Sequence, residues 1–572
     1  MPTYRPAITG TRHVISAGHH AATHAGFTIL EAGGNAVDAG VAAGIALGIL
    51  QTDRVNFAGV APIMIFLAER QEVINIDGLG CWPRAADLSL FQREYGGKMP
   101  PGVLRTVIPA APDAWITALE HYGTMSFGEV AAAATRFARD GFPMHWFMAE
   151  YIRDHEADYR RFPTSIPVFL PNDRPPEVNE IFVQPALGRT LQYMADEERA
   201  HASKGRKAGL AAARAAFYKG DIAQAIARFY REQGGWMTAE DLAEFRVRFE
   251  APVKTRFRDL DVYGCGPWCQ GPVLIQTLNI LDGIDLKAMG HNSPDYIHTV
   301  TEALKLAFAD RHRYYGDPRF VDVPIEELAS AAYAAERRKA ISPQRAAPGM
   351  PEAGNVRGRS GAKATPLPAA DRGEPAPLAD TSYVCVIDRH GNAFSATPSD
   401  GSSAMPVEPV TGLVPSSRGS QSSTDPNHPA CLAPGKRPRL TPNPAIILKG
   451  GKVHMPFGSP GNDIQPQAMV QTLLNVALFG MDPQSAVEAP RFATYSYPSS
   501  SAPHTYHPGR LNLENRIEPG TGDALAARGH DVKWWPEIEW RAGAVCAIVR
   551  NETTGVMSAG ADPRRLAYAL GW

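Results

Sequence analysis

The sequence predicts a mixed α/β protein whose first part is mainly helical and whose last part is mainly β. Apolar residues recur at helix spacing in several segments before residue 313, whereas short apolar runs typical of strands prevail after residue 381. Residues 343–380 separate the two parts and are rich in Pro, Gly, Ala and charge, which is typical of a mobile connection. A strand that begins abruptly at Thr381, directly after this connection, is the most informative feature of the chain.

The expected elements follow in chain order. Residues 23–32 form a helix that ends at Gly33 and Gly34, and Asn35 can cap a second helix over residues 36–50. Strands at residues 62–68 and 72–76 form a hairpin, and further helices are expected at 109–139, 210–233 and 296–312. After Thr381 we expect a hairpin, strands at 443–448 and 453–457, a helix over 466–478 and a Trp-rich β region near 534–540.

Composition argues against two classes of partner. The 57 Lys and Arg residues balance 59 Asp and Glu residues, so electrostatics gives no reason to expect nucleic acid or an anionic membrane. No apolar run approaches the roughly 20 residues that a membrane span needs. Residues 1–6 lack an apolar signal region, which favours a cytoplasmic protein. A hydrophobic share of 44% is enough to build a sizeable core.

The sequence gives no reason to expect a metal or another cofactor. Six widely spaced cysteines predict reduced thiols rather than a zinc site: Cys81, Cys265, Cys269, Cys385, Cys431 and Cys546. His20 and His24 have the i, i+4 spacing of helical zinc ligands, but no acidic residue stands at a useful distance from them. Structural or surface histidines are therefore expected there.

Thr381 has the position that a self-cleaving enzyme needs. A cut between Asp380 and Thr381 would place a hydroxyl and a free α-amine on one residue. An α-amine titrates near ~8, so close to neutral pH it can take the hydroxyl proton and act as the base for its own nucleophile. Considered alone, Thr381 is more simply explained as an ordinary residue at the start of a strand.

A set of motifs in a fixed order strengthens the enzymatic interpretation. The sequence reads ILEAGGNAVDA at 29–39, KLAFADR at 305–311, DTS at 380–382, DRHGNA at 388–393, APGKRP at 433–438 and GSPG at 458–461. Over nearly the whole chain this order resembles the γ-glutamyltranspeptidase family. The resemblance implies a four-layer αββα sandwich of the N-terminal-nucleophile hydrolases. It also implies a zymogen that cuts itself into a large subunit, 1–380, and a small subunit, 381–572.

Strand arithmetic predicts the neighbours of Thr381. If residues 389–392 form the turn, Asp388 pairs with Ala393 and the numbers of antiparallel partners sum to 781. Thr381 then faces Asp400 within a residue or two, and Ser399 lies beside it. By resemblance, Ser399 supplies the second hydroxyl, which hydrogen-bonds the catalytic threonine.

Acyl transfer also needs donors that stabilise a developing oxyanion. The glycine-rich turn at residues 458–463 offers backbone N–H groups just before a predicted helix. The resemblance assigns this role to Gly461 and Asn462, where Asn462 stands in place of a second glycine. An ordinary tight turn is the alternative.

The substrate-binding positions depart from those of true γ-glutamyl enzymes. Leu79 replaces an arginine that holds the substrate α-carboxylate, and Ser420 and Gln421 replace the acidic pair that receives the α-amine. Gly401 replaces a side-chain amide, and only Thr441 retains a hydroxyl of a serine pair. Two further residues near the nucleophile, Arg418 and Asp400, are candidates for substrate contact; Arg418 could bind a carboxylate or orient a loop. Loss of both ends of the zwitterion clamp argues against glutathione.

The sequence therefore favours an amidohydrolase or acylase that cleaves a small-molecule amide through an acyl-enzyme on Thr381. Residues 417–438 resemble the acylase and amidohydrolase branch of the family. Two alternatives stay open: a γ-glutamyltransferase (glutathione hydrolase) with an altered pocket, and an uncut, non-catalytic binding protein of the same fold. Acyl transfer to an amine is a further alternative to hydrolysis. The resemblance also implies a heterodimer of the two pieces, alone or paired again.

Overall fold

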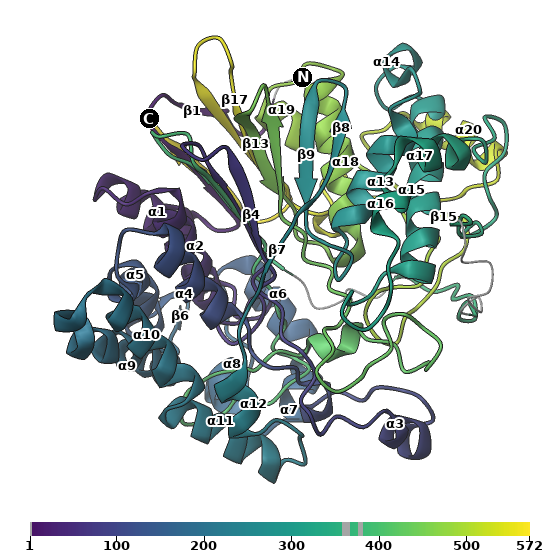
Figure 1. Ribbon diagram of the computed structural model, residues 1–572. Coiled ribbons are helices and arrows are strands. Elements are labelled where there is room, and N and C mark those ends of the chain that lie inside the picture. Colours follow the sequence, from purple (N-terminus) through teal and green to yellow (C-terminus); the bar gives the residue numbers. More distant parts are fainter. Residues whose placement is uncertain (1–2, 357–365, 376–380) are drawn as a thin grey trace.

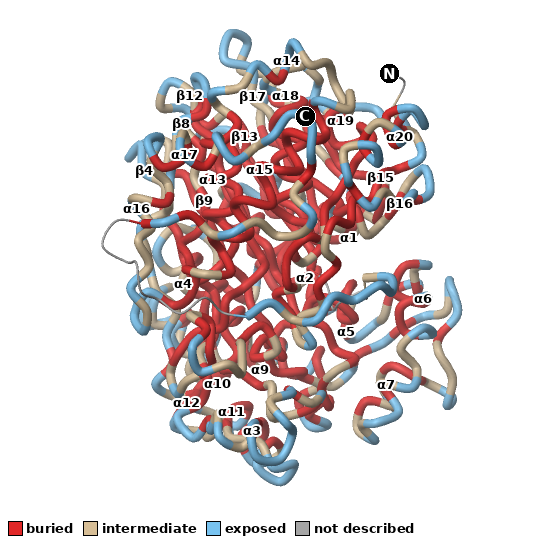
Figure 2. The backbone as a smooth tube through the Cα atoms, turned by 90° about the vertical axis from the view of Figure 1, so that its right-hand side faces the viewer, coloured by how far each residue is buried: buried red, intermediate tan, exposed pale blue. Residues whose placement is uncertain are grey.

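The computed structural model describes residues 3–356, 366–375 and 381–572. Two seven-stranded sheets are stacked on each other, and helices pack on the outer side of each sheet (Figure 1). The predicted four-layer αββα architecture is thus confirmed. Buried residues run through the centre of all four layers, while exposed residues lie at the periphery (Figure 2).

The first sheet, called the β10 sheet, has the order β19-β2-β10-β11-β3-β4-β7. Its strands are β19 (Tyr568–Gly571), β2 (Val14–Ala17), β10 (Val384–Ile387), β11 (Ala393–Ala396), β3 (Ile63–Leu67), β4 (Glu72–Ile76) and β7 (Phe249–Glu250). The second, called the β13 sheet, has the order β1-β18-β17-β13-β12-β9-β8. Its strands are β1 (Ile8–Gly10), β18 (Met557–Ala561), β17 (Cys546–Arg550), β13 (Lys452–Gly458), β12 (Ala445–Lys449), β9 (Leu260–Gly264) and β8 (Val253–Phe257).

Helices α1 and α2 pack on the β10 sheet, and α13 and α18 pack on the β13 sheet. The β10 side contains α1 (His20–Glu31), α2 (Ala36–Leu50), α4 (Ala111–Tyr122), α5 (Phe127–Asp140), α9 (Pro185–His201), α10 (Arg206–Tyr218), α11 (Asp221–Glu232) and α12 (Ala239–Glu244). The β13 side contains α13 (Gly271–Leu281), α15 (Pro294–Tyr314), α17 (Ala331–Arg338), α18 (Gln465–Ala477) and α19 (Pro483–Glu488). A small sheet has the order β14 (Phe492–Thr494), β15 (Arg510–Glu514) and β16 (Asp531–Trp535), with α20 (Pro519–Ala527) before β16.

Shorter elements border these layers. They are α3 (Leu88–Tyr95), α6 (Trp146–Asp154), α7 (Glu156–Arg160), α8 (Ile166–Phe169), α14 (Leu286–Met289), α16 (Ile325–Leu328) and the two-stranded pair β5 (Phe142–Pro143) and β6 (Ile181–Phe182). Among the described residues, no helix combines the length and the apolar character that crossing a membrane requires.

Helix α2 illustrates how the sequence sets the inner packing. Every residue from Ala36 to Leu50 is buried, so the helix needs the small side chains that the sequence supplies. Asn35 accepts hydrogen bonds from the backbone N–H groups of Val37 and Asp38, and the Asp38 carboxylate accepts from the N–H of Asn35. This capping box satisfies the free amides at the helix start, as expected from Asn35.

Three predicted helices differ from the observed ones. The first begins at His20 rather than residue 23, because the His19 imidazole caps it by accepting from the N–H of Ala21. The predicted helix 109–139 is two helices, α4 and α5, because Ser126 starts a new helix with its own capping box. The predicted helix 210–233 is also two, α10 and α11, which are separated at Gly220.

The hairpin after Thr381 has a register one residue away from the prediction. Ile387 pairs with Ala393 and Val384 with Ala396, so partner numbers sum to 780 instead of 781. The loop is one residue shorter than predicted: the N–H of Asp388 donates to the carbonyl of Asn392 at 3.1 Å. Gly391 takes φ +81°, the left-handed conformation that closes such a three-residue loop. Continued outward, this register pairs Thr381 with Ser399 rather than Asp400.

Each sheet combines strands that precede the predicted cut with strands that follow it. In the β10 sheet, β10 and β11 lie between β2 and β3, and in the β13 sheet, β12 lies beside β9. The predicted large and small subunits are therefore not separate folding units in space. The predicted cut itself lies at Asp380, outside the described residues.

The connection at 343–380 has contacts wherever it is described. The N–H of Ala346 donates to the carbonyl of Arg528 at 2.8 Å, and the N–H of Ala347 donates to Glu302 at 3.1 Å. Further along, the N–H of Asp371 donates to the carbonyl of Tyr506 at 2.8 Å. Its mobility stays a prediction, but these parts are attached to the β13 side of the molecule.

A buried charge network joins β15 to the C-terminal strands. Arg564, fully buried, forms two parallel hydrogen bonds to Glu514, at 2.7 and 2.6 Å, and contacts Asp562 at 3.2 Å. Arg491 donates to the same Asp562 at 2.5 Å. Removing one partner of such a buried network leaves a charge without compensation, which is strongly destabilising.

We expect Arg564→Ala to lower the free energy of unfolding by about 3–5 kcal/mol. The measurement is a urea titration of uncut chains carrying Thr381→Ala, so that processing does not complicate the comparison. Arg199, whose side chain is 75% exposed, provides the matched control, and Arg199→Ala should leave the midpoint unchanged. Equal midpoints for the two variants would contradict the importance of the network.

Candidate active site

Thr381 lies at the start of the strand segment that leads into β10, and it is almost completely buried. Its Oγ1 atom lies 2.8 Å from the Oγ of Ser399, which is fully buried and pairs with it across the hairpin. Ser399 pairs on its other side with Val60, next to β3. The two hydroxyls are thus held by the backbone of three neighbouring segments, as the sequence predicted for Ser399.

Arg418 places a positive charge against this pair of hydroxyls. It begins the short 3-10 turn Arg418–Gln421, is buried, and its guanidinium donates to the Oγ of Ser399. Its Nε lies 3.8 Å from Asp400. A positive charge two hydrogen bonds from the Thr381 hydroxyl favours loss of the hydroxyl proton. Of the two roles predicted for Arg418, this geometry supports the orientation of its neighbours.

Asp400 has a supporting position rather than a surface open to substrate. Its carboxylate accepts from the hydroxyls of Ser416 and Ser417, the latter at 2.6 Å, and from the N–H of Ser417 at 3.0 Å. Burial raises its pKa, while Arg418 and the two serines oppose that rise. Its φ of +143° lies in a region that side chains other than glycine rarely adopt, which often marks functional sites.

The predicted oxyanion turn contains two successive residues with positive φ, and both residue types tolerate that conformation. Gly461 takes φ +120°, where a side chain would be strained, and Asn462 takes φ +52°, a left-handed conformation that asparagine tolerates. The turn leads into α18, whose first residue, Gln465, donates to Thr381 Oγ1 at 3.4 Å. The turn and the positive end of the α18 dipole therefore lie beside the Thr381 hydroxyl.

Arg311 holds this turn in place through hydrogen bonds to Asp463 and its neighbours. It is fully buried near the end of α15, and its guanidinium donates to Asp463, to Ser500 at 3.0 Å and to Gln270 at 2.8 Å. Asp463 in turn accepts from the N–H of Ser500 at 2.7 Å. The KLAFADR motif thus ends in a residue that holds the predicted oxyanion turn through Asp463.

Gln421 joins the predicted substrate residues to the oxyanion turn. Its Nε2 lies 2.9 Å from Thr441 Oγ1 and 3.3 Å from Asn462 Oδ1, and its Oε1 accepts from the N–H of Thr441 at 3.1 Å. Gln421 is buried, whereas Ser420 is partly exposed on the same short turn. Leu79, in contrast, is buried in the apolar core between the sheets, so this position offers no charge to a substrate.

Sequence reasoning assigned no role to three residues that border the site. Gln465 bridges Thr381 to the N–H of Asn443, and its position directly after the glycine-rich turn was the available signal. Arg311 was recognised only as part of a motif. Arg54 is buried, and its Cζ lies 3.9 Å from the ring centroid of Phe147 and 5.2 Å from that of Trp540. No local sequence pattern indicates those long-range contacts.

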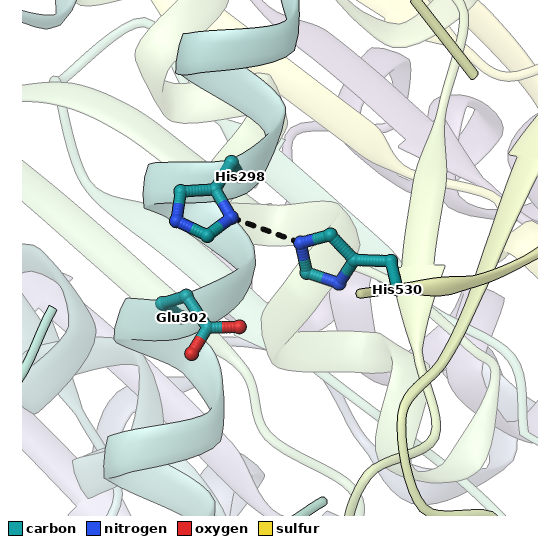
Figure 3. Close-up of side chains that lie close together, drawn as sticks. All are labelled: His298, Glu302 and His530. Atoms are coloured by element: carbon teal, nitrogen blue, oxygen red, sulfur yellow. Dashed lines mark hydrogen bonds between the residues drawn. The ribbon is translucent and has the colours of Figure 1, made fainter. Parts of the chain in front are cut away.

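Within the described residues, His298, Glu302 and His530 form the one group with metal-ligand geometry (Figure 3). His298 and Glu302 lie one turn apart on α15, and His298 Nδ1 is 2.9 Å from His530 Nε2. Glu302 forms an ion pair with Lys305 Nζ at 2.7 Å. An ammonium at that distance repels a divalent cation and so disfavours metal binding. We interpret the group as a polar network that attaches the start of the 343–380 connection to α15.

The comparisons with known proteins agree with this geometry. The family model for gamma-glutamyltranspeptidase matches residues 22–572. The chain is 30% identical over 568 residues to the glutathione hydrolase-like YwrD proenzyme of Bacillus subtilis (strain 168), covering 99% of both chains. It is 31% identical to the acylase ACY 1 proenzyme of Pseudomonas sp. (strain V22), covering 96% of this chain and 91% of the relative.

A solved structure of cephalosporin acylase from Bacillus halodurans superimposes with a TM-score of 0.86 at 28% identity, and the match covers 100% of this chain and 98% of the other. All three matches extend across Thr381 and so include both predicted pieces of the chain. The chain therefore belongs to the γ-glutamyltranspeptidase family and is an autoprocessed N-terminal-nucleophile amidohydrolase of that family.

Proposed function

We propose that Thr381 is the nucleophile, that a cut after Asp380 frees its α-amine, and that the enzyme then hydrolyses the amide bond of a small molecule. The observation that carries the proposal is the buried contact between Thr381 Oγ1 and Ser399 Oγ, backed by the guanidinium of Arg418. Gly461 and Asn462 are the proposed backbone donors to the oxyanion, since their turn adjoins Gln465.

The self-cleavage follows from a hydroxyl that lies next to its own peptide bond. Thr381 Oγ1 attacks the carbonyl carbon of Asp380, the bond from that carbon to the Thr381 nitrogen breaks, and the nitrogen takes the hydroxyl proton. An ester between Asp380 and Thr381 Oγ1 results. Water hydrolyses this ester and releases the carboxylate of Asp380 and the free α-amine of Thr381.

The same hydroxyl then carries out the reaction on substrate. The α-amine of Thr381 takes the Oγ1 proton, directly or through a water, and Oγ1 attacks the amide carbonyl. The oxyanion forms beside Gly461 and Asn462, and the leaving amine takes the proton as the carbon–nitrogen bond breaks. Water attacks the acyl-enzyme and releases the acid, which restores the threonine.

The side chains around the pocket favour an acylase over a glutathione hydrolase. Gln421 is already bonded to Thr441 and Asn462 and carries no charge to receive a substrate ammonium. Leu79 lies in the core and cannot bind an α-carboxylate. Hydrolysis rather than transfer to an amine is proposed for the same reason, because the acyl-donor clamp is altered.

We also propose a heterodimer of residues 1–380 and 381–572, or a dimer of such heterodimers. Each sheet combines hydrogen-bonded strands from both pieces, which supports a heterodimer that stays together after the cut. A cytoplasmic location is proposed from the six cysteines, all of which are free thiols.

Thr381→Ala should give an uncut and inactive chain, because it removes the attacking oxygen. Intact mass is the measurement: wild-type protein should show two species, residues 1–380 and 381–572, and the variant one species of 572 residues. Thr381→Ser should cut slowly and keep some activity, since it retains a hydroxyl. A processed, active Thr381→Ala chain would rule out this site, and an uncut wild type would favour a binding protein.

Ser399→Ala should slow self-cleavage by about 10- to 100-fold, the value of a hydrogen bond of roughly 1.5–3 kcal/mol near a charged group. Ser399→Thr should retain most of the rate. The fraction of cut chain against time, read by mass, is the measurement. Ser395 is a matched control, a buried serine of β11 that bonds Tyr383 instead, so Ser395→Ala should cut at the wild-type rate.

A γ-glutamyl anilide separates hydrolysis of other amides from true γ-glutamyl transfer. We expect little release of the aniline, and no increase when a dipeptide acceptor is added, because Leu79 and Gln421 leave the zwitterion without charged partners. A rate that rises with the dipeptide would establish the transferase alternative.

A further inference from the structure

Gln465 is the first residue of α18, and its side chain is directed at the Thr381 hydroxyl. It is completely buried, and its Nε2 donates to Thr381 Oγ1 at 3.4 Å. Its Oε1 accepts from the backbone N–H of Asn443, which is also completely buried, at 3.1 Å. The side-chain amide thus connects the hydroxyl to the backbone just before β12, and the reaction proposed above does not use it.

The two partners of Gln465 determine which way its amide faces. A backbone N–H can only donate, so the atom that faces Asn443 is the oxygen. The amide nitrogen, which also can only donate, then faces Thr381. Thr381 Oγ1 is therefore the acceptor in this hydrogen bond, wherever its own proton points. Because a carboxamide does not titrate between acid and alkaline pH, this donor is present throughout that range.

A second donor reaches the same oxygen from Ser399. The guanidinium of Arg418 can only donate, and it occupies a lone pair of Ser399 Oγ. This favours the orientation in which the Ser399 hydroxyl donates to Thr381 Oγ1, 2.8 Å away. Arg418 also polarises that hydroxyl and makes it a stronger donor. Thr381 Oγ1 thus lies between an amide N–H and a hydroxyl that can both donate to it.

This arrangement prepares Thr381 Oγ1 for attack. The two donors occupy both lone pairs of the hydroxyl oxygen, and its own proton occupies the remaining direction. When the base takes that proton, the electron pair left behind is the one without a hydrogen bond, and it forms the bond to the carbonyl carbon. The two donors stabilise the negative charge that develops on the oxygen as the proton leaves.

We propose that Gln465 is a catalytic residue whose amide donates to the Thr381 oxygen as that oxygen loses its proton. The inference rests on the function proposed above and extends it, because Oγ1 attacks in self-cleavage and in hydrolysis alike. This donor serves the nucleophile, whereas Gly461 and Asn462 serve the oxyanion of the attacked carbonyl. A neutral amide suits the position, since a carboxylate there would repel the developing charge.

Two substitutions at Gln465 separate this role from a structural one. Gln465→Glu keeps the shape and an oxygen for the N–H of Asn443, but in its ionised form it cannot donate and it places a negative charge beside Thr381. Gln465→Met removes the donor and the contact with Asn443 without adding charge. A purely structural residue would therefore tolerate Glu better than Met.

The proposal predicts the opposite order. At pH 8 we expect Gln465→Met to slow self-cleavage by about tenfold or more, and Gln465→Glu to slow it further. The measurement is the fraction of cut chain against time, read by intact mass. A Gln465→Met chain that cuts at the wild-type rate, or a Gln465→Glu chain that cuts at least as fast as Gln465→Met, would overturn the proposal.

The pH dependence of Gln465→Glu gives a second readout. A protonated glutamic acid again carries an O–H that can donate to Thr381 Oγ1. Burial raises the pKa of such a carboxyl above its usual ~4.3, so the defect relative to wild type should shrink as the pH falls from 8 to 5. Gln465→Met has no titrating group at this position, and its rate relative to wild type should stay constant with pH.

Gln471 provides the matched control, as a buried glutamine of the same helix. Its Oε1 accepts from the N–H of Phe492 at 3.2 Å, and its Nε2 donates to the carbonyls of Gln467 and Phe492 at 3.1 and 2.8 Å. Gln471→Met should therefore cut at the wild-type rate. If Gln465→Glu does not fold, a slowing by Met that is confined to position 465 supports the proposal, and equal rates at both positions contradict it.

Failure of this role can be told apart from failure of the proposed function. A wild-type chain that stays uncut contradicts the function itself, and the role of Gln465 falls with it. A wild-type chain that is cut before Thr381, together with a Gln465→Met chain cut equally fast, contradicts the role of Gln465 alone.

Discussion

The antiparallel pairing that sets Thr381 against Ser399 is the constraint on which the site depends. A slip of one residue would turn every side chain of β10 and β11 to the opposite face of the sheet. The loop with Gly391 in the left-handed conformation fixes the register, and β2 and β3 hold the hairpin on both sides. The Thr381 hydroxyl is thus positioned by a backbone bridge to Ser399 that continues the β10–β11 pairing.

Charge around this pairing is balanced by residues that come from distant parts of the chain. Arg418 contacts both Ser399 and Asp400, and Arg311 connects α15 to the turn that follows β13. Each buried guanidinium has a carboxylate nearby, so the desolvation of one charge is offset by the other. The positive field at the hydroxyl is therefore a property of the folded core and persists where water is excluded.

Sequence patterns predicted the elements that depend on local chemistry, such as the Asn35 cap, the hairpin of β3 and β4, and the helix after the glycine-rich turn. They failed where two helices follow each other closely, because the local breaks at the Ser126 capping box and at Gly220 were overlooked within one apolar period. The register was missed by one residue because turn length depends on how the loop closes between Asp388 and Asn392. Thr381, Ser399 and the turn at Gly461 could be found from motifs. The place of Gln465 directly after that turn was a usable signal that was missed, whereas the contacts of Arg54 with Phe147 and Trp540 could not be predicted, since they join residues far apart in the sequence.

Both sheets combine strands from the two sides of Thr381, which is consistent with the proposal that one hydroxyl serves two reactions. Each sheet contains ladders that join the two predicted pieces, so the cut would remove one peptide bond and leave those ladders intact. The contact between Thr381 and Ser399 already exists in the uncut chain. The geometry proposed for self-cleavage would therefore be inherited by the cut enzyme, and the proposed cut would add only the free α-amine of Thr381. A precursor that folds completely before it is cut needs no later rearrangement of its core to become active.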